Sequence, residues 1–364
     1  MYVEQERPEL PEVSASQEVF QRLVRNDLSV VDSLALIDEK CDKCAALAEA
    51  IDTHSQERAD LLGGLWEPWD AGVPEGAPTP PPVPAPVGTW AELAQFLVES
   101  GVDDLNASVQ LEGDDRLSVA SVAAGRIADG FELARAAGLS DADTSAWFTG
   151  SSNSADATDS PDATNSSNAT HSANSPEVTD SADASASDLS EDAVDALANA
   201  VRQWDCAAQL IPFYTASENQ KASAVESRGR AQVQQLLNLS VLVLASDVPD
   251  RRVPSCVGTF EKAAGDSDVS ELDLIQSQLT AANLELFAQH PRLSVAGAQP
   301  LYTDSLSSSV LIENIRYWAG YSTVPGTPGV RIVDSAELND GSGATEPTED
   351  FGELTTFWNP NKGD

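Results

Sequence analysis

The chain has 364 residues, enough for two domains that each bury a core of their own. Acidic residues outnumber basic ones 59 to 20, which gives a net charge of -39 and a pI of about 4.1. A surface this negative repels phosphate groups, so we expect neither nucleic acid nor an anionic lipid surface as a partner. The charge itself is typical of a protein that must stay in solution in a salty or crowded setting.

The first apolar pattern at helical spacing begins after Ser14 and ends at Gly63-Gly64. Ser14 and Gln17 are spaced as a capping box, and the paired glycines predict a C-terminal cap. The apolar face continues through Cys41 and Cys44, where the sequence allows a break in the helix. We therefore predict one long helical segment, interrupted at most near these two cysteines.

A proline-rich segment follows at residues 70–88 and predicts an extended chain lying on a surface. Thr89 is the expected N-cap of a helix that reaches Val109. A further helical pattern ends at Gly138. Together these segments predict an N-terminal helical bundle over residues 14–138.

Residues 151–187 differ from the rest in composition. They consist mainly of Ser, Thr, Asp, Asn, Ala and Pro, with almost no large apolar side chain to bury. We predict a disordered acidic linker, whose Ser and Thr content also suits O-glycosylation. His171 lies inside this linker and is not expected to be a ligand.

Helical patterns resume with Ser190 as the expected cap, and Pro212 is expected to kink or end the first of them. Three more helices complete a C-terminal four-helix bundle over residues 190–330, followed by a flexible tail at 331–364. These helices are predicted at Glu218–Ala245, Glu271–His290 and Leu306–Tyr321. Apart from the short stretch GVRIV, no strand pattern is present. The predicted fold class is all-α, with two helical bundles in series.

Neither a membrane span nor a signal peptide is visible in the sequence. The most apolar run, Leu236–Ala245, is far shorter than the roughly 18 residues that a transmembrane helix needs. The N-terminal residues lack the basic and apolar regions of a signal peptide. If the protein is exported, we expect this chain to be its mature part.

Two stretches resemble a known family. HSQERADLLGGLWEPW (residues 54–69) and SSVLIENIRYWAGYSTVPGTPG (residues 308–329) are similar to the actinobacterial secreted or lipoprotein family with a DUF4439 domain. The resemblance rests on the closing helix with Arg316 and Trp318 and on the Pro325-Gly326 turn. It implies a ferritin-like four-helix bundle in the C-terminal half and an extracellular or cell-envelope location, with a lipid anchor as one form the precursor can take. It implies no particular reaction.

A ferritin-like metal site takes carboxylates from two helices and Glu-x-x-His motifs from the other two. No Glu-x-x-His is present, because Ile51, Asn168 and Phe287 stand three residues before the three histidines. One carboxylate on each helix of the C-terminal bundle gives the right count for a cluster: Asp205, Glu226, Glu285 and Glu313. Without histidine partners we interpret them as solvated or locally satisfied acids, and we predict no metal and no cofactor. A metal-binding or oxidoreductase bundle that uses Glu226, Glu285 and Glu313 is the alternative.

The chain has four cysteines, and we favour a local Cys41–Cys44 disulfide together with a Cys206–Cys256 bridge. A redox pair of the thioredoxin type follows a strand and lies at a helix N-terminus. Here no strand precedes the CxxC, and the acids around it disfavour a thiolate. A zinc site would need a second pair at matching spacing, which Cys206 and Cys256 do not provide.

No catalytic residues are predicted. The sequence has no nucleophile elbow and no phosphate-binding glycine loop. We expect His54, Arg58 and Trp66 to tie the end of the first long helix to the proline-rich segment. The first hypothesis is a non-enzymatic, exported cell-envelope protein that acts as a binding or scaffold module, with an envelope protein as its partner. An acidic cytoplasmic protein of a salt-adapted organism is the other alternative.

Overall fold

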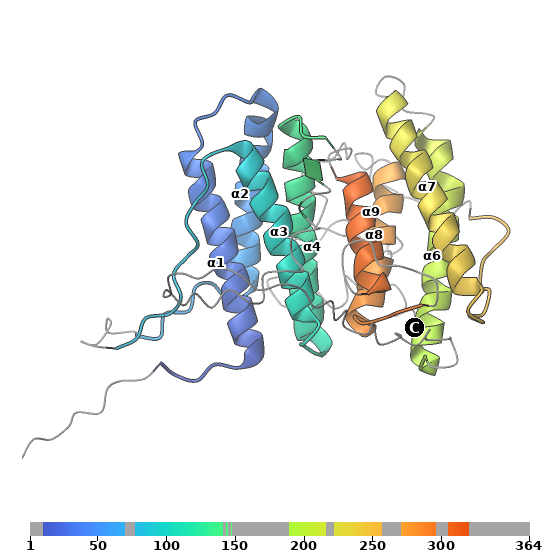
Figure 1. The fold of residues 1–364 in the computed structure, drawn as a ribbon, viewed down its shortest axis with the longest axis horizontal. Helices are drawn as coiled ribbons and strands as arrows, with labels where there is room; N and C mark the ends of the chain where they lie inside the picture. Colours follow the sequence, from blue (N-terminus) through green and yellow to red (C-terminus); the bar gives the residue numbers. More distant parts are fainter. Residues whose placement is uncertain are drawn as a thin grey trace, which may run out of the picture.

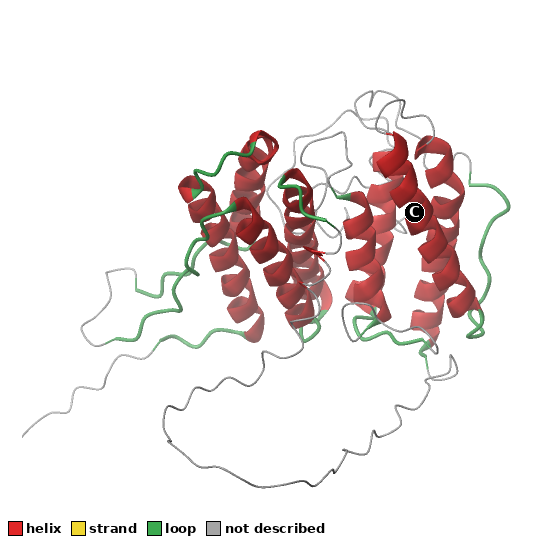
Figure 2. Ribbon diagram, turned by 45° about the horizontal axis from the view of Figure 1, so that its top comes forward, coloured by secondary structure: helices red, strands yellow, loops and turns green. Residues whose placement is uncertain are grey.

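The computed structural model describes residues 10–69, 77–140, 143–144, 147, 189–215, 222–256, 271–295 and 305–319. Within these residues the secondary structure is entirely helical (Figure 2). The helices are α1 (Ala15–Leu36), α2 (Asp42–Leu61), α3 (Trp90–Ser108), α4 (Gly113–Ala136), α6 (Glu191–Thr215), α7 (Ala222–Leu244), α8 (Glu271–Gln289) and α9 (Leu306–Trp318). The all-α prediction is confirmed for the described part of the chain.

Helices α1 to α4 pack side by side (Figure 1). Each of α1 and α4 packs against both α2 and α3. The two ends of the connection from α2 to α3 lie at opposite ends of α1. At its start, Trp66 N–H donates to Gln21 near the beginning of α1, and at its end Trp90 N–H donates to Glu39 beyond the end of α1. Because of this long crossover, α2 and α3 run in the same direction.

The helix ends follow from local hydrogen bonds. Ser14 accepts the N–H of Gln17 at 3.1 Å, and Thr89 accepts the N–H of Glu92 at 3.2 Å, so both predicted N-caps are confirmed. Gly63 and Gly64 have φ angles of 88° and 71°, a backbone conformation that glycine adopts without strain. The predicted C-terminal cap at these glycines is therefore confirmed as well.

The first long segment is divided into two helices. α1 ends at Leu36 and α2 begins at Asp42, so the break allowed near the cysteines is present. No Pro or Gly lies in the intervening segment. The turn is held instead by Cys41, which caps α2, and by Glu39, whose backbone carbonyl accepts the indole N–H of Trp90 at 2.9 Å.

Helices α6 to α9 repeat this packing plan. α6 packs against α7 and α8, and α9 packs against the same two helices. The predicted cap Ser190 accepts the N–H of Ala193 at 3.2 Å. Pro212 does not end α6, which continues to Thr215, because the proline lies within its last turn. The other three helices lie within the predicted spans and end up to four residues from the predicted limits.

Helix α4 joins the two groups, because it also packs against α8 and α9. A continuous apolar cluster crosses this contact and includes Ile127 and Phe131 from α4, Phe287 from α8 and Ile312 from α9. α4 is buried on nearly all sides and is correspondingly rich in Ala, Gly and Ser. Small residues allow close packing: a Cβ added to Gly130 would lie 2.9 Å from the backbone nitrogen of Val98 on α3.

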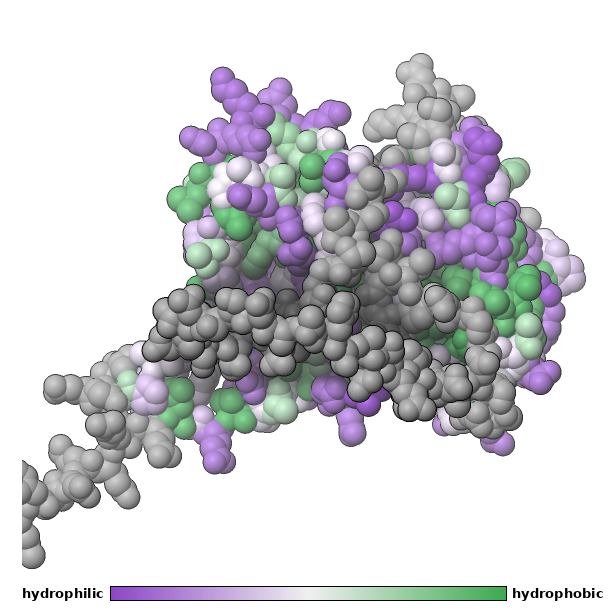
Figure 3. All heavy atoms as spheres, viewed as in Figure 1, coloured by the Kyte–Doolittle hydropathy of each residue, from purple (hydrophilic) through white to green (hydrophobic). Residues whose placement is uncertain are grey.

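On the face shown in Figure 3, hydrophilic and apolar residues are interspersed, and apolar atoms are visible over α7. Exposed large apolar side chains on this helix include Leu237 and Val241. Among the described helices, none combines the length and apolar character needed to cross a membrane. The predicted linker at 151–187, the GVRIV stretch and the tail at 331–364 lie outside the described residues.

Candidate functional site

A cluster of charged side chains is buried between α1, α2, α3 and α4, and we call it the polar centre. Every one of the four helices contributes to it. Its members are Arg22, Asn26 and Asp27 from α1, His54, Ser55 and Arg58 from α2, Asp104 from α3, and Arg126 and Asp129 from α4. All of them except Arg22 are buried.

Two aspartates on neighbouring helices hold Arg126. Asp27 accepts hydrogen bonds from Nη2 of Arg126 at 2.7 Å and from its Nε at 3.3 Å. Asp104 accepts a hydrogen bond from Nη1 of the same guanidinium. Asp104 also accepts from Asn26 Nδ2 at 3.2 Å and from Arg22 Nε at 2.8 Å. This carboxylate therefore links α1, α3 and α4.

Arg58 connects the same cluster to α2. Its Nε donates to Asp27 at 3.0 Å, its Nη1 to Asp129 at 2.7 Å and its Nη2 to the hydroxyl of Ser55 at 3.0 Å. The second oxygen of Asp129 lies 2.9 Å from Nδ1 of His54. Both oxygens of Asp129 are thus engaged by α2.

The titration of this part of the centre follows from burial and ion pairing. Burial lowers the pKa of His54, but the hydrogen bond and charge of Asp129 raise it by more, so the net pKa lies above the ordinary 6.5. Burial raises the pKa of Asp129, but the neighbouring Arg58 and His54 lower it by more, so that carboxyl stays ionised. One turn further along α4, burial and the charge of Asp129 raise the pKa of Glu132 to about 7.

The polar centre neutralises its own charge. The three carboxylates of Asp27, Asp104 and Asp129 face the three guanidinium groups of Arg22, Arg58 and Arg126. A guanidinium group has no lone pair to offer a metal ion, and it occupies the carboxylate oxygens that could otherwise serve as ligands. The arrangement is suited to holding four helices together, and it leaves no carboxylate of the three unpaired for acid–base chemistry.

The expected role of His54, Arg58 and Trp66 was partly wrong. His54 and Arg58 point into the polar centre and bind Asp129, while Trp66 binds Gln21 through its backbone. The position of these side chains near the helix end does not by itself indicate these partners. The signal that the prediction missed is a set of opposite charges, one or more on each helix, placed within otherwise apolar faces.

The four carboxylates predicted as low-ranking metal candidates do not converge. Each is bonded to a residue three or four positions further along its own helix. These pairs are Asp205 with Gln209, Glu226 with Arg230, Glu285 with Gln289 and Glu313 with Arg316. Across the described residues, no group of three or more His, Cys, Asp or Glu side chains is arranged to hold a metal ion.

The interior of α6 to α9 has neutral amides where the first four helices have charges. Gln232 of α7 donates to Gln276 of α8 and to Asn314 of α9, both at 2.8 Å, and Gln276 donates back at 2.7 Å. Asn314 in turn donates to the hydroxyl of Thr280 at 2.6 Å. These four side chains therefore form one hydrogen-bonded network between α7, α8 and α9.

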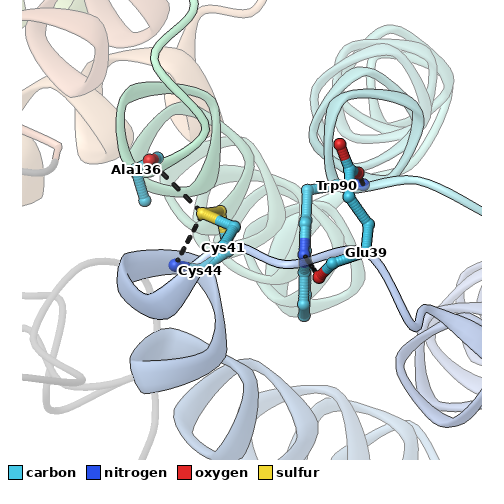
Figure 4. Close-up of a disulfide and its surroundings, with 5 residues drawn as sticks. All are labelled: Glu39, Cys41, Cys44, Trp90 and Ala136. Atoms are coloured by element: carbon cyan, nitrogen blue, oxygen red, sulfur yellow. Dashed lines mark hydrogen bonds between the residues drawn. A yellow bond between two sulfur atoms is a disulfide. The ribbon is translucent and has the colours of Figure 1, made fainter.

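Both cysteine pairs are joined, each with an S–S distance of 2.05 Å. Cys206 of α6 is bonded to Cys256 in the connection after α7, and both residues are fully buried. The Cys41–Cys44 bridge lies at the start of α2 beside the Glu39–Trp90 contact (Figure 4). Cys41 is itself the N-cap of α2, which the sequence did not predict.

Comparison of the chain with protein-family models, with curated proteins and with solved structures gave no match.

Proposed function

We propose that the protein is a non-catalytic, exported helical module of ferritin-like architecture that acts as a scaffold or binding protein of the cell envelope. The observation that carries this proposal is the polar centre, in which arginine side chains pair with carboxylates from three of the four helices.

The connectivity supports the ferritin-like part of the proposal. Ferritin-like bundles consist of two helical hairpins joined by one long crossover connection. The pairs α1–α2 and α3–α4 have this relation, with the crossover in residues 62–89. The pairs α6–α7 and α8–α9 follow the same packing plan. We therefore extend the proposed architecture, which the sequence resemblance suggested for the C-terminal half alone, to both groups of helices.

The composition of the centre supports a role without metal chemistry. In ferritin-like metal proteins the four helices project carboxylates and histidines inward around two cations. Here the four helices also project ionisable groups inward, but Arg58 and Arg126 supply the positive charge. Removal of either arginine would leave two buried carboxylates with fewer partners, so the centre depends on the arginines for stability.

The two disulfides support export. Disulfides persist in oxidising compartments and are rare in a reducing cytoplasm. The excess of 39 negative charges fits an extracellular setting and also the cytoplasm of a salt-adapted organism, so charge alone does not separate the two.

Fractionation of cells that express the protein natively tests the proposal. We expect the chain in the envelope or the medium, with Cys206 and Cys256 protected from alkylation in denaturant until a reductant is added. A chain found in the cytosol with alkylatable Cys206 and Cys256 would refute export and favour the salt-adapted alternative. The Cys206–Cys256 pair is the appropriate reporter because both of its residues are buried.

A further inference from the structure

The two cysteines of the Cys41–Cys44 disulfide differ in burial. Cys41 is partly exposed, whereas Cys44 is fully buried. The other bridge differs in this respect, since Cys206 and Cys256 are both fully buried. An external thiolate must approach a disulfide sulfur in order to attack it. Of the two bridges, Cys41–Cys44 alone contains a cysteine that is not fully buried, and that cysteine is Cys41.

The position of Cys41 also suits a thiolate. Cys41 is the N-cap of α2, and its Sγ accepts the backbone N–H of Cys44 at 3.1 Å (Figure 4). Helix N-termini stabilise thiolates, because the free N–H groups and the helix dipole favour negative charge there. Asp38, Glu39 and Asp42 act in the opposite direction. The Glu39 carboxylate, however, is directed toward the N-terminus of α3, where it accepts the N–H of Trp90 at 3.1 Å.

The surroundings provide a partner for the protonated thiol as well. The carbonyl oxygen of Ala136, at the end of α4, lies 3.6 Å from Sγ of Cys41. A disulfide sulfur has no hydrogen to donate to this oxygen, but a reduced Cys41 has one. A Cys41 thiolate therefore has a donor in the N–H of Cys44, and a Cys41 thiol has an acceptor in the carbonyl of Ala136. The Glu39–Trp90 hydrogen bonds that hold the turn before α2 do not involve either sulfur. Reduction does not require the bundle to open.

We infer that Cys41–Cys44 is a thiol–disulfide exchange site whose substrate is a protein or peptide dithiol. A substrate thiolate attacks Sγ of Cys41, the Cys41–Cys44 bond breaks, and Cys44 leaves as a thiolate that takes up a proton from solvent. The second substrate thiolate then attacks the substrate sulfur of the mixed disulfide and releases Cys41, which is also protonated. Two electrons and two protons pass from the substrate, which becomes a disulfide, to the cysteine pair. The exchange occurs once per chain. The inference does not rest on the proposed scaffold function.

The first test uses the oxidised full-length chain without denaturant. Graded dithiothreitol is added, the reaction is quenched with acid, and free thiols are alkylated and identified by peptide mass spectrometry. We expect dithiothreitol to reduce the Cys41–Cys44 bridge at least tenfold faster than the Cys206–Cys256 bridge. The helical circular-dichroism signal should be retained. Reduction of Cys41–Cys44 only in denaturant, or at the same rate as the buried bridge, would overturn the inference.

The second test separates the roles of the two sulfurs and follows the reaction itself. In Cys44→Ser the remaining Cys41 should form a mixed disulfide with a small aromatic disulfide at least tenfold faster than the remaining Cys44 does in Cys41→Ser. Equal rates would contradict the assignment of Cys41 as the attacked sulfur. The oxidised wild-type chain should also convert a reduced two-cysteine peptide to its disulfide in equimolar amount. No peptide oxidation would show that the bridge is structural only.

Discussion

The two groups of four helices share a packing plan but have different interiors. The first has a buried network of ion pairs, and the second has a buried network of neutral amides. Corresponding helix pairs are linked in both. α2 and α4 are joined by His54 and Asp129, and α7 and α9 by Gln232 and Asn314.

The second correspondence links the other two pairs of helices. α1 and α3 are joined through Asn26 and Asp104, and α6 and α8 through Trp204, whose indole donates to Asn283 at 2.8 Å. One architecture therefore tolerates two chemically different centres. Loss of one partner should destabilise the charged centre more than the amide centre, because an unpaired buried charge is far more unfavourable than an unpaired amide.

The largest expected effect comes from removing one charge from the first centre. Arg126→Met leaves Asp27 and Asp104 with fewer partners in a buried site, and we expect the free energy of unfolding to fall by about 3–5 kcal/mol. Urea unfolding with hydrogen exchange of α4 peptides measures the loss. The matched change in the second group, Gln232→Met, should lower stability by only about 1–3 kcal/mol. Equal losses for the two variants would remove the distinction between the centres.

The disulfides give the next contrast. The Cys206–Cys256 bridge spans 50 residues, so its removal should lower stability by about 4 kcal/mol on the loop-entropy model. The Cys41–Cys44 bridge spans only three positions and should contribute about half as much or less. Thermal melts of the two double-serine variants test this order. A larger loss at Cys41–Cys44 would show that this short bridge has a stabilising role that chain entropy does not explain.

Glu132 and His54 should make the stability of the first four helices depend on pH. Glu132 releases its proton near pH 4.5 when unfolded but near pH 7 when folded, so stability falls as pH rises through this window. His54, whose pKa is raised by Asp129, acts in the same direction, and its contribution is lost above its folded pKa. Glu132→Gln should therefore stabilise the protein at pH 8 by on the order of 2 kcal/mol and change little at pH 4. Unfolding curves at both pH values measure this effect. A variant with no gain in stability at pH 8 would contradict the raised pKa of Glu132 in the folded chain.

The smallest effect concerns close helix packing. Gly130→Ala places a Cβ 2.9 Å from the backbone of Val98, and we expect a net loss of about 1–2 kcal/mol after the gain in helix propensity. Gly229→Ala in α7 meets only the side-chain carbons of Thr215 and Ile211, at 3.0 and 3.1 Å, which can adjust. Its stability should stay within about 1 kcal/mol of the wild type. The opposite order would mean that α3 and α4 can separate more readily than their contact implies.

The helices and their caps could be predicted from the sequence, because Ser14, Thr89, Ser190 and Gly63-Gly64 act through hydrogen bonds within a few residues. The polar centre could not be predicted in the same way. Its hydrogen-bonded partners are separated by up to 99 positions, and the network is complete only when four helices meet.

A trace of the centre was nevertheless present in the sequence. Asp27 stands three residues from both Val24 and Val30, inside the apolar face of α1, and Arg126 stands among the small residues of α4. Charged residues of opposite sign in such positions indicate a buried ion-pair network. The start of α2 was harder to define, since the cap is a cysteine, which is not among the preferred N-cap residues.

The most direct test of a centre held by arginines is the metal content of the full-length protein. Protein purified after growth in medium supplemented with iron, manganese or zinc should contain less than about half an equivalent of any of these metals by mass spectrometry. Asp129→Asn and Glu285→Gln should leave that content unchanged. One or more tightly held equivalents per chain, lost in Asp129→Asn but kept in Glu285→Gln, would contradict the account and place a cation where the structure has guanidinium groups.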